Sequence, residues 1–222
     1  MLMECTFCRN VACFRGAPEE SPKACPMVTH AEVYERGRQE YAQPEASALQ
    51  VAGCYVESHG YMKWNRVREL IEFSKFMNYK RIGIAHCIGL MQEASTLALI
   101  LQKEGFEAVQ VLCKTGAVNK EDIGVPKGYR LNPEEPFEAA CNPVTQAEVC
   151  NREETDLNVI VGLCIGHDIT FTQYSRAPVT TLIVKDRTNG HNPAAALYSF
   201  YQRSELMGQQ RLYSITKKAP AT

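Results

Sequence analysis

The sequence lacks an excess of charge of either sign: 24 Lys and Arg residues are balanced by 25 Asp and Glu residues, for a net charge of -1. A near-neutral chain has no electrostatic reason to bind nucleic acid or membrane surfaces in general, so we expect neither as a partner. No run approaches the ~18 apolar residues of a membrane span, and the first residues, MLMECTFCRNVACFRG, contain no apolar signal-peptide core. These absences predict a cytoplasmic protein.

Nucleotide-binding motifs are also missing. The chain contains neither a G-x-G-x-x-G turn nor a Walker loop, so its sequence gives no support for nucleotide binding. Charged residues make up 22% and hydrophobic residues 45% of the chain, which excludes a disordered or fibrous protein.

Cysteine is unusually frequent in this sequence, with ten in 222 residues. In a reducing compartment these thiols are expected to stay reduced. Metal binding and thiolate chemistry therefore outrank disulfides as explanations for them.

Short apolar runs alternate with helical patterns along most of the chain. Because the apolar runs are unbroken, they indicate a parallel sheet covered on both faces. We predict an α/β fold with three layers, a mostly parallel sheet of four or slightly more strands, an N-terminal four-cysteine metal-binding module and a helical segment. The expected strands cover residues 81–87, 107–113, 158–164 and 178–184, and the clearest helices cover 63–78, 90–104 and 143–153. The predicted domains are 1–28 (the cysteine module), 29–79 (helices packed on the core) and 80–205 (a Rossmann-like domain).

The first group of cysteines is Cys5, Cys8, Cys13 and Cys25, in the spacing C-x2-C-x4-C-x11-C. Four thiolates suit a closed tetrahedral zinc site, and a [4Fe-4S] cluster takes the same ligands, so the metal stays open. The alternative is four free thiols in a disordered tail. We favour metal binding because a loop this poor in core residues needs a cross-link to become ordered.

The second group lies at the ends of predicted strands. Cys87, Cys113 and Cys164 each end a strand, and Cys141 directly precedes a helix. Since ligands of open parallel sheets bind beyond the carboxyl ends of the strands, these thiols are candidates for nucleophiles, a second metal site or a cluster site. The alternative is that each is a small buried packing residue, which is our expectation for Cys54 and Cys150.

Four further residues follow the same strand ends. His167 and His191 could serve as bases or ligands for a thiol, and Lys185 and Arg187 could hold an anionic substrate. With Cys87 and Cys164 they form our candidate catalytic set. The neighbouring Asp168 and Asp186 are better explained by helix capping and a salt bridge.

Several longer motifs, together with the N-terminal cysteine module, carry a family resemblance: GYMKWNRV, IGIAHCIGL, CNPVTQAE, GLCIGHD, APVTTLIVKDR and GHNP. Over roughly residues 5–200 the chain resembles an uncharacterised prokaryotic family, domain of unknown function 1847. The resemblance implies a metal-binding protein with a zinc site at Cys5, Cys8, Cys13 and Cys25, and it implies no reaction.

The residues therefore support two functions. The first is a metalloprotein whose strand-end thiols carry out redox or sulfur-transfer chemistry on an unknown small molecule. The second is a non-catalytic metal-binding or sensor protein in which the cysteines only hold a metal. The sequence indicates neither the oligomeric state nor whether the protein is an enzyme.

Overall fold

A computed structural model describes residues 5–208 of the chain. The chain divides into two compact units, Met1–Lys63 and Trp64–Thr222. None of the helices in the described part is long and apolar enough to cross a membrane.

The first unit consists of helices and holds almost no core. Its elements are η1 (Cys5–Phe7), α1 (Ala12–Arg15), η2 (Pro18–Glu20), α2 (Pro26–Thr29), α3 (Ala31–Glu40) and α4 (Pro44–Gly60). From residue 5 to residue 63, only Ala12, Ala52 and Gly60 are buried. Hydrophobic burial within this unit therefore contributes little to its stability.

The second unit is built on a four-stranded sheet in the order β2-β1-β3-β4. Its strands are β1 (Arg81–His86), β2 (Glu107–Leu112), β3 (Leu157–Val161) and β4 (Val179–Ile183). Every neighbouring pair is parallel. The predicted α/β fold with a parallel four-stranded sheet is thus confirmed.

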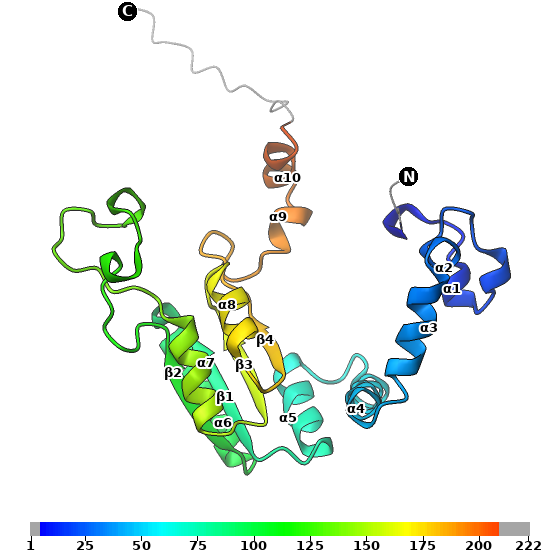
Figure 1. Ribbon diagram of the computed structural model, residues 1–222, viewed down its shortest axis with the longest axis horizontal. Coiled ribbons are helices and arrows are strands. Elements are labelled where there is room, and N and C mark those ends of the chain that lie inside the picture. The colour runs from blue at the N-terminus through cyan, green and yellow to red at the C-terminus, as the bar shows by residue number, and fades with distance from the viewer. Residues whose placement is uncertain (1–4, 209–222) are drawn as a thin grey trace, which may run out of the picture. The chain divides into compact units, whose positions relative to one another are not determined.

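Two helices cover each face of this sheet (Figure 1). On one face, α5 (Arg66–Phe76) and α6 (Met91–Lys103) pack on the odd-numbered positions of β3, such as Val159. On the other face, α7 (Pro143–Arg152) and α8 (His167–Tyr174) pack on Ile160, and the fully buried Phe171 lies among them. Alternate apolar side chains of β1 and β3 enter opposite layers, as the pleat requires.

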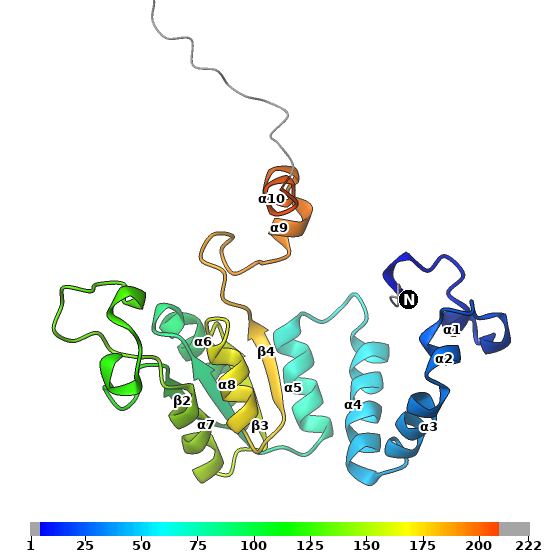
Figure 2. The same cartoon turned by 45° about the horizontal axis from the view of Figure 1, so that its top comes forward.

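The remaining elements lie in the connections and after β4. They are η3 (Ile88–Leu90), η4 (Glu121–Ile123), η5 (Lys127–Tyr129), α9 (Ala195–Tyr198) and α10 (Phe200–Leu206). Residues 113–142 form a long excursion between β2 and α7, drawn in green in Figure 2.

Two sequence predictions need correction. The strand expected at 158–164 ends at Val161, because Gly162 turns the chain with φ of +67° and the side chain of Leu90 fills the space where its Cβ would lie. Cys164 consequently follows β3 in a loop instead of ending the strand. Cys54, expected to be a packing residue, is exposed on α4, whereas Cys150 is fully buried as expected.

Candidate functional site

The strand-end cysteines lie at the point where the sheet reverses its order. From β1 the chain moves outward through α6 to β2, and it then returns through α7 to β3 on the other side of β1. Helices α6 and α8, which follow β1 and β3, cover opposite faces of the sheet. The carboxyl ends of β1 and β3 therefore form a topological switch point, the position at which open α/β sheets commonly bind their ligands.

Cys87 and Cys113 form the buried floor of this region. They are 6% and 1% exposed, and both belong to the apolar layer beneath α7 and α8. The Cys113 N–H donates to the carbonyl of His86 at 2.9 Å, and the N–H of Ile88 donates to the Cys113 sulfur at 3.3 Å. The turn that follows β1 thus lies directly against the thiol that follows β2.

Cys141 arrives at the same place from the far end of the 113–142 excursion. The base of the excursion is closed by two bonds: the Asn142 N–H donates to the Cys113 carbonyl at 2.8 Å, and Lys114 Nζ donates to the Ala139 carbonyl at 2.5 Å. Asn142 also caps α7, its side-chain oxygen accepting the N–H of Thr145 at 3.2 Å. Cys141 is half-buried beside Cys113.

The two thiols of this pair have pKa values shifted in opposite directions. Hydrogen bonds from Cys113 and then from His167 lower the pKa of Cys141 to about 4, and the positive charge of Lys114 contributes. The same Cys141 hydrogen bond, together with burial, raises the pKa of Cys113 well above its ordinary value. Burial of Cys113 and the nearby His167 and Lys114 both favour negative charge on Cys141, with Cys113 as the hydrogen-bond donor.

Cys164 and Arg187 form a second contact at the rim. Arg187 Nη2 donates to the Cys164 sulfur at 3.1 Å, and this contact raises the pKa of the guanidinium. The charge of Arg187 also interacts with Cys87 and Cys141. The arginine thus links Cys164 electrostatically to the other strand-end thiols.

Lys185 reaches the turn after β1, where a Cβ on Gly89 would lie 3.2 Å from its Nζ. His191 faces a backbone group, since its Nδ1 accepts the N–H of Asp186 at 3.1 Å. That bond makes the ring a positioning group for the segment after β4, and no described contact joins it to a cysteine. Asp186 accepts hydrogen bonds from its own turn, and Asp168 accepts the next N–H of α8, as structural carboxylates do.

Sequence reasoning did not single out Lys114 or Gly89. Lys114 follows the thiol that ends β2, so its position beside Cys113 was available as a signal. The contact between Gly89 and Lys185 had no signal, because it joins turns after two strands that are not neighbours in the sheet.

The N-terminal cysteines lie in the first unit. Cys5 and Cys8 share one turn, with the Cys8 N–H donating to the Cys5 carbonyl at 3.1 Å, and Cys25 precedes α2. Throughout residues 5–208, no group of three or more His, Cys, Asp or Glu side chains is arranged to hold a metal ion.

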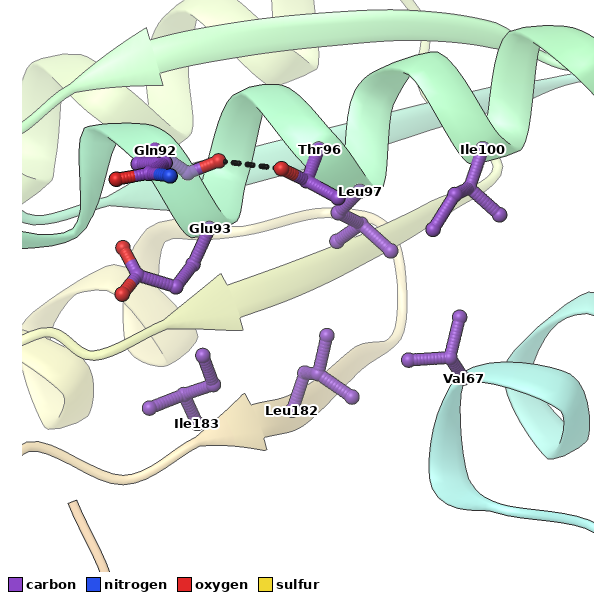
Figure 3. A pocket seen from close by; sticks show the side chains of 8 residues that line it. All are labelled: Val67, Gln92, Glu93, Thr96, Leu97, Ile100, Leu182 and Ile183. Carbon is purple, nitrogen blue, oxygen red and sulfur yellow. Dashed lines mark hydrogen bonds between the residues drawn. The ribbon is translucent and has the colours of Figure 1, made fainter. Parts of the chain in front are cut away.

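An open groove of about 490 Å³ lies on the opposite face of the sheet, between α5, α6 and β4 (Figure 3). Its walls include Val67, Leu97 and Leu182, and Thr96 donates to the backbone of Gln92 within its own helix. No strand-end cysteine lines this groove. It is therefore separate from the thiol site.

Comparison with known proteins places the chain among uncharacterised relatives. It is 45% identical over 205 residues to "Uncharacterized protein MJ0455" of Methanocaldococcus jannaschii, covering 92% of this chain and 98% of that protein. No solved structure matches it. The model of the family described as "Protein of unknown function (DUF1847)" matches residues 25–182, a range that includes Cys25 and all the strand-end cysteines. The chain therefore belongs to the family of unknown function DUF1847.

Proposed function

We propose that the protein acts on small molecules that contain a sulfur–sulfur bond, with Cys141 as the nucleophile and Cys113 as the second thiol. The observation that supports this most directly is the hydrogen-bonded pair itself. Cys141 is partly accessible and its pKa is lowered, whereas Cys113 is buried and its pKa is raised. A thiolate is the reactive form of cysteine, and an adjacent thiol is what a two-step exchange requires.

In the first step the Cys141 thiolate attacks one sulfur of the substrate. A bond forms between Cys141 and that sulfur, the substrate bond breaks, and the departing sulfur leaves as a thiolate. In the second step Cys113 attacks the Cys141 sulfur and forms a disulfide, and the proton of Cys113 leaves with the released thiol. Two protein thiols are thereby oxidised while one sulfur–sulfur bond is reduced. With a sulfane-sulfur donor, the thiolate instead attacks the outer, sulfane sulfur, the donor's sulfur–sulfur bond breaks, the rest of the donor leaves as a thiolate or sulfite, and a persulfide remains on Cys141.

His167 and Lys114 support the first step. Both stabilise negative charge on the Cys141 sulfur, and His167 does so through a direct hydrogen bond. The buried floor formed by Cys87 and Cys113 limits the access of water from beneath.

The test uses an uncharged substrate, 2-hydroxyethyl disulfide, and fully reduced protein. We expect release of mercaptoethanol and a Cys113–Cys141 disulfide, detected by peptide mass spectrometry. Cys113→Ser should stop at a mixed disulfide on Cys141, and Cys141→Ser should abolish the reaction. Cys54→Ser is the matched control, because it removes an exposed thiol in the first unit. An undiminished rate in Cys141→Ser would show that another cysteine is the nucleophile.

A second candidate function is metal binding by Cys5, Cys8, Cys13 and Cys25. The observation that favours it is the lack of core in the first unit, where only Ala12, Ala52 and Gly60 are buried between residues 5 and 63. The four thiolates have the chemistry that zinc or a [4Fe-4S] cluster requires, and Cys5 and Cys8 already share one turn. A bound metal would stabilise this unit where apolar burial does not.

Elemental analysis of anaerobically purified protein tests this second function. The double substitution of Cys8 and Cys13 by Ser should remove one metal equivalent and loosen the first unit, while the sheet unit stays folded. An unchanged metal content would contradict the assignment to these cysteines. One equivalent lost and another retained would direct attention to the strand-end thiols as a second metal site. Metal without any thiol exchange would identify a binding or sensor protein.

A further inference from the structure

Two cationic side chains from the segment after β4 extend over the thiol end of the sheet. Arg187 donates to the Cys164 sulfur at 3.1 Å, in the loop that follows β3. Lys185 extends farther, to the turn that follows β1, where its Nζ occupies space left open by Gly89. Because β3 separates β4 from β1 in the sheet, Lys185 reaches across the carboxyl end of β3 to the turn after β1.

Neither cation is neutralised by a carboxylate. In the described range 5–208, no ion pair involves Lys185 or Arg187, although six other arginines have carboxylate partners. Asp186, which lies between the two cations in sequence, and Asp168, in the first turn of α8, accept backbone N–H groups of their own turns. The partner of Arg187 is a sulfur atom of the site itself. The positive charge at the rim is therefore available to a ligand.

The segment that carries these cations is held in place. The Asp186 N–H donates to His191 Nδ1 at 3.1 Å, and the His191 N–H donates to the Asp186 carbonyl at 2.7 Å. These reciprocal bonds close the chain between the two residues into a fixed turn. This turn positions Lys185 and Arg187 over the carboxyl ends of the strands, although no carboxylate of the described residues is bonded to either side chain.

We propose that Lys185 and Arg187 bind an anionic group of the substrate, so that the substrate is a small compound with a carboxylate or sulfonate-type oxyanion near its sulfur–sulfur bond. This inference rests on the proposed thiol exchange and names its substrate class. Arg187 offers a planar fork of donors that fits an oxyanion, and Lys185 adds a point charge. Arg187 donates to the Cys164 sulfur and interacts electrostatically with Cys141 and Cys87, so an anion that it binds lies at the same strand ends as these thiols.

A series of three disulfides that differ in charge tests the inference: dithiodiglycolate (anionic), 2-hydroxyethyl disulfide (neutral) and cystamine (cationic). Each rate is divided by the rate of the same disulfide with mercaptoethanol, which removes differences in intrinsic reactivity. We expect the wild-type protein to prefer the anionic over the neutral disulfide by ~5-fold or more, the effect of one unit charge at ~4 Å even in bulk water. Cystamine should be the poorest substrate, and 0.5 M salt should reduce the preference.

Three variants assign the preference to its residues. Arg187→Met and Lys185→Met should each reduce the anion preference severalfold, and either variant suffices if the other fails to fold. Arg176→Met is the matched control, because Arg176 is also exposed but precedes β4, at the opposite end of the strand. The Arg176→Met protein should show the same anion preference as the wild type. Equal normalised rates for the three disulfides, or a preference that survives in both rim variants, would overturn the inference and leave the thiol exchange intact. Failure of the neutral disulfide to react at Cys141 would overturn the proposed function itself.

Discussion

Alkylation of Cys141 by iodoacetamide should proceed at nearly the same rate at pH 6 and at pH 8. Its pKa lies at about 4 because Cys113 and His167 donate hydrogen bonds to its sulfur, so the thiolate is fully formed across this range. Free cysteine, with a pKa of ~8.5, gains ~80-fold in thiolate over the same interval. A flat pH profile is therefore the signature of the charge distribution in the pair.

The absolute rate can also be worked out. At pH 6 free cysteine is only ~0.3% thiolate, which gives Cys141 an advantage of ~300-fold in the reactive form. A low pKa also lowers nucleophilicity, with a Brønsted coefficient of ~0.4–0.5, and over ~4.5 units this costs ~60–180-fold. Cys141 should consequently react ~2–5-fold faster than free cysteine at pH 6 and ~15–40-fold more slowly at pH 8.

The assay follows carbamidomethylation of each cysteine by peptide mass spectrometry, with free cysteine as the reference in a parallel reaction. Cys113→Ala should bring back a rise in rate with pH, because it removes the main donor to the Cys141 sulfur. The positive charges of Lys114 and Arg187 remain in that variant, so the return should be partial. A wild-type rate at Cys141 that climbs ~80-fold between pH 6 and pH 8 would refute the thiolate reasoning.

Three further predictions concern stability. Phe171→Ala, which empties a fully buried position between α8 and the sheet, should lower the free energy of unfolding by ~3–5 kcal/mol in urea titration, and a loss below ~1 kcal/mol would contradict the packing described. Gly162→Ala should be destabilising, because a Cβ there would lie 1.9 Å from Leu90 Cδ1 and the backbone has a φ of +67°. In a Leu90→Ala background the clash should disappear while the backbone strain stays, so the two losses in stability should not add. Additive losses in this double-mutant cycle would refute the close approach. Hydrogen bonds from the Asn132 N–H and Lys120 lower the pKa of Glu138 from 4.5 to about 2, so its stabilising effect is present above pH 4.5 and is lost as the pH falls toward 2. The difference in melting temperature between wild type and Glu138→Gln should shrink over that range, and a constant difference would count against the assignment.

The position of the thiol site was predictable because it follows from topology alone. Parallel strands end at one edge of the sheet, so Cys87 and Cys113 had to lie near each other once their strands were recognised. The partnership of Cys113 with Cys141 was not predictable, because it depends on the path of the chain from residue 113 to residue 142. A sequence pattern shows that such a connection is irregular, and it does not show where the connection returns.

The contacts of Lys185 and Arg187 were beyond sequence reasoning for a related reason. Their type indicated anion binding, but their reach depends on side-chain conformation and on the space left by Gly89. For the N-terminal cysteines the residue types can be read from the sequence, but their arrangement in space cannot. Their spacing predicts a donor set for a metal, which stays a prediction because the arrangement of such donors would depend on a bound ion.

The segment 113–142, which carries Cys141, is held together by contacts within itself. Ion pairs join Lys120 to Glu138 and Arg130 to Glu121 inside it, and Asn119 and Ala139 form an isolated β-bridge. Such a segment can open in a local fluctuation while the sheet stays intact, with a free energy well below that of global unfolding. Each opening would withdraw Cys141 from Cys113 and His167 and return its thiol to ordinary acidity. If Cys141 is the nucleophile, as we propose, the lifetime of its charged form would follow the local opening rate of this segment, which amide hydrogen exchange in residues 113–142 would report.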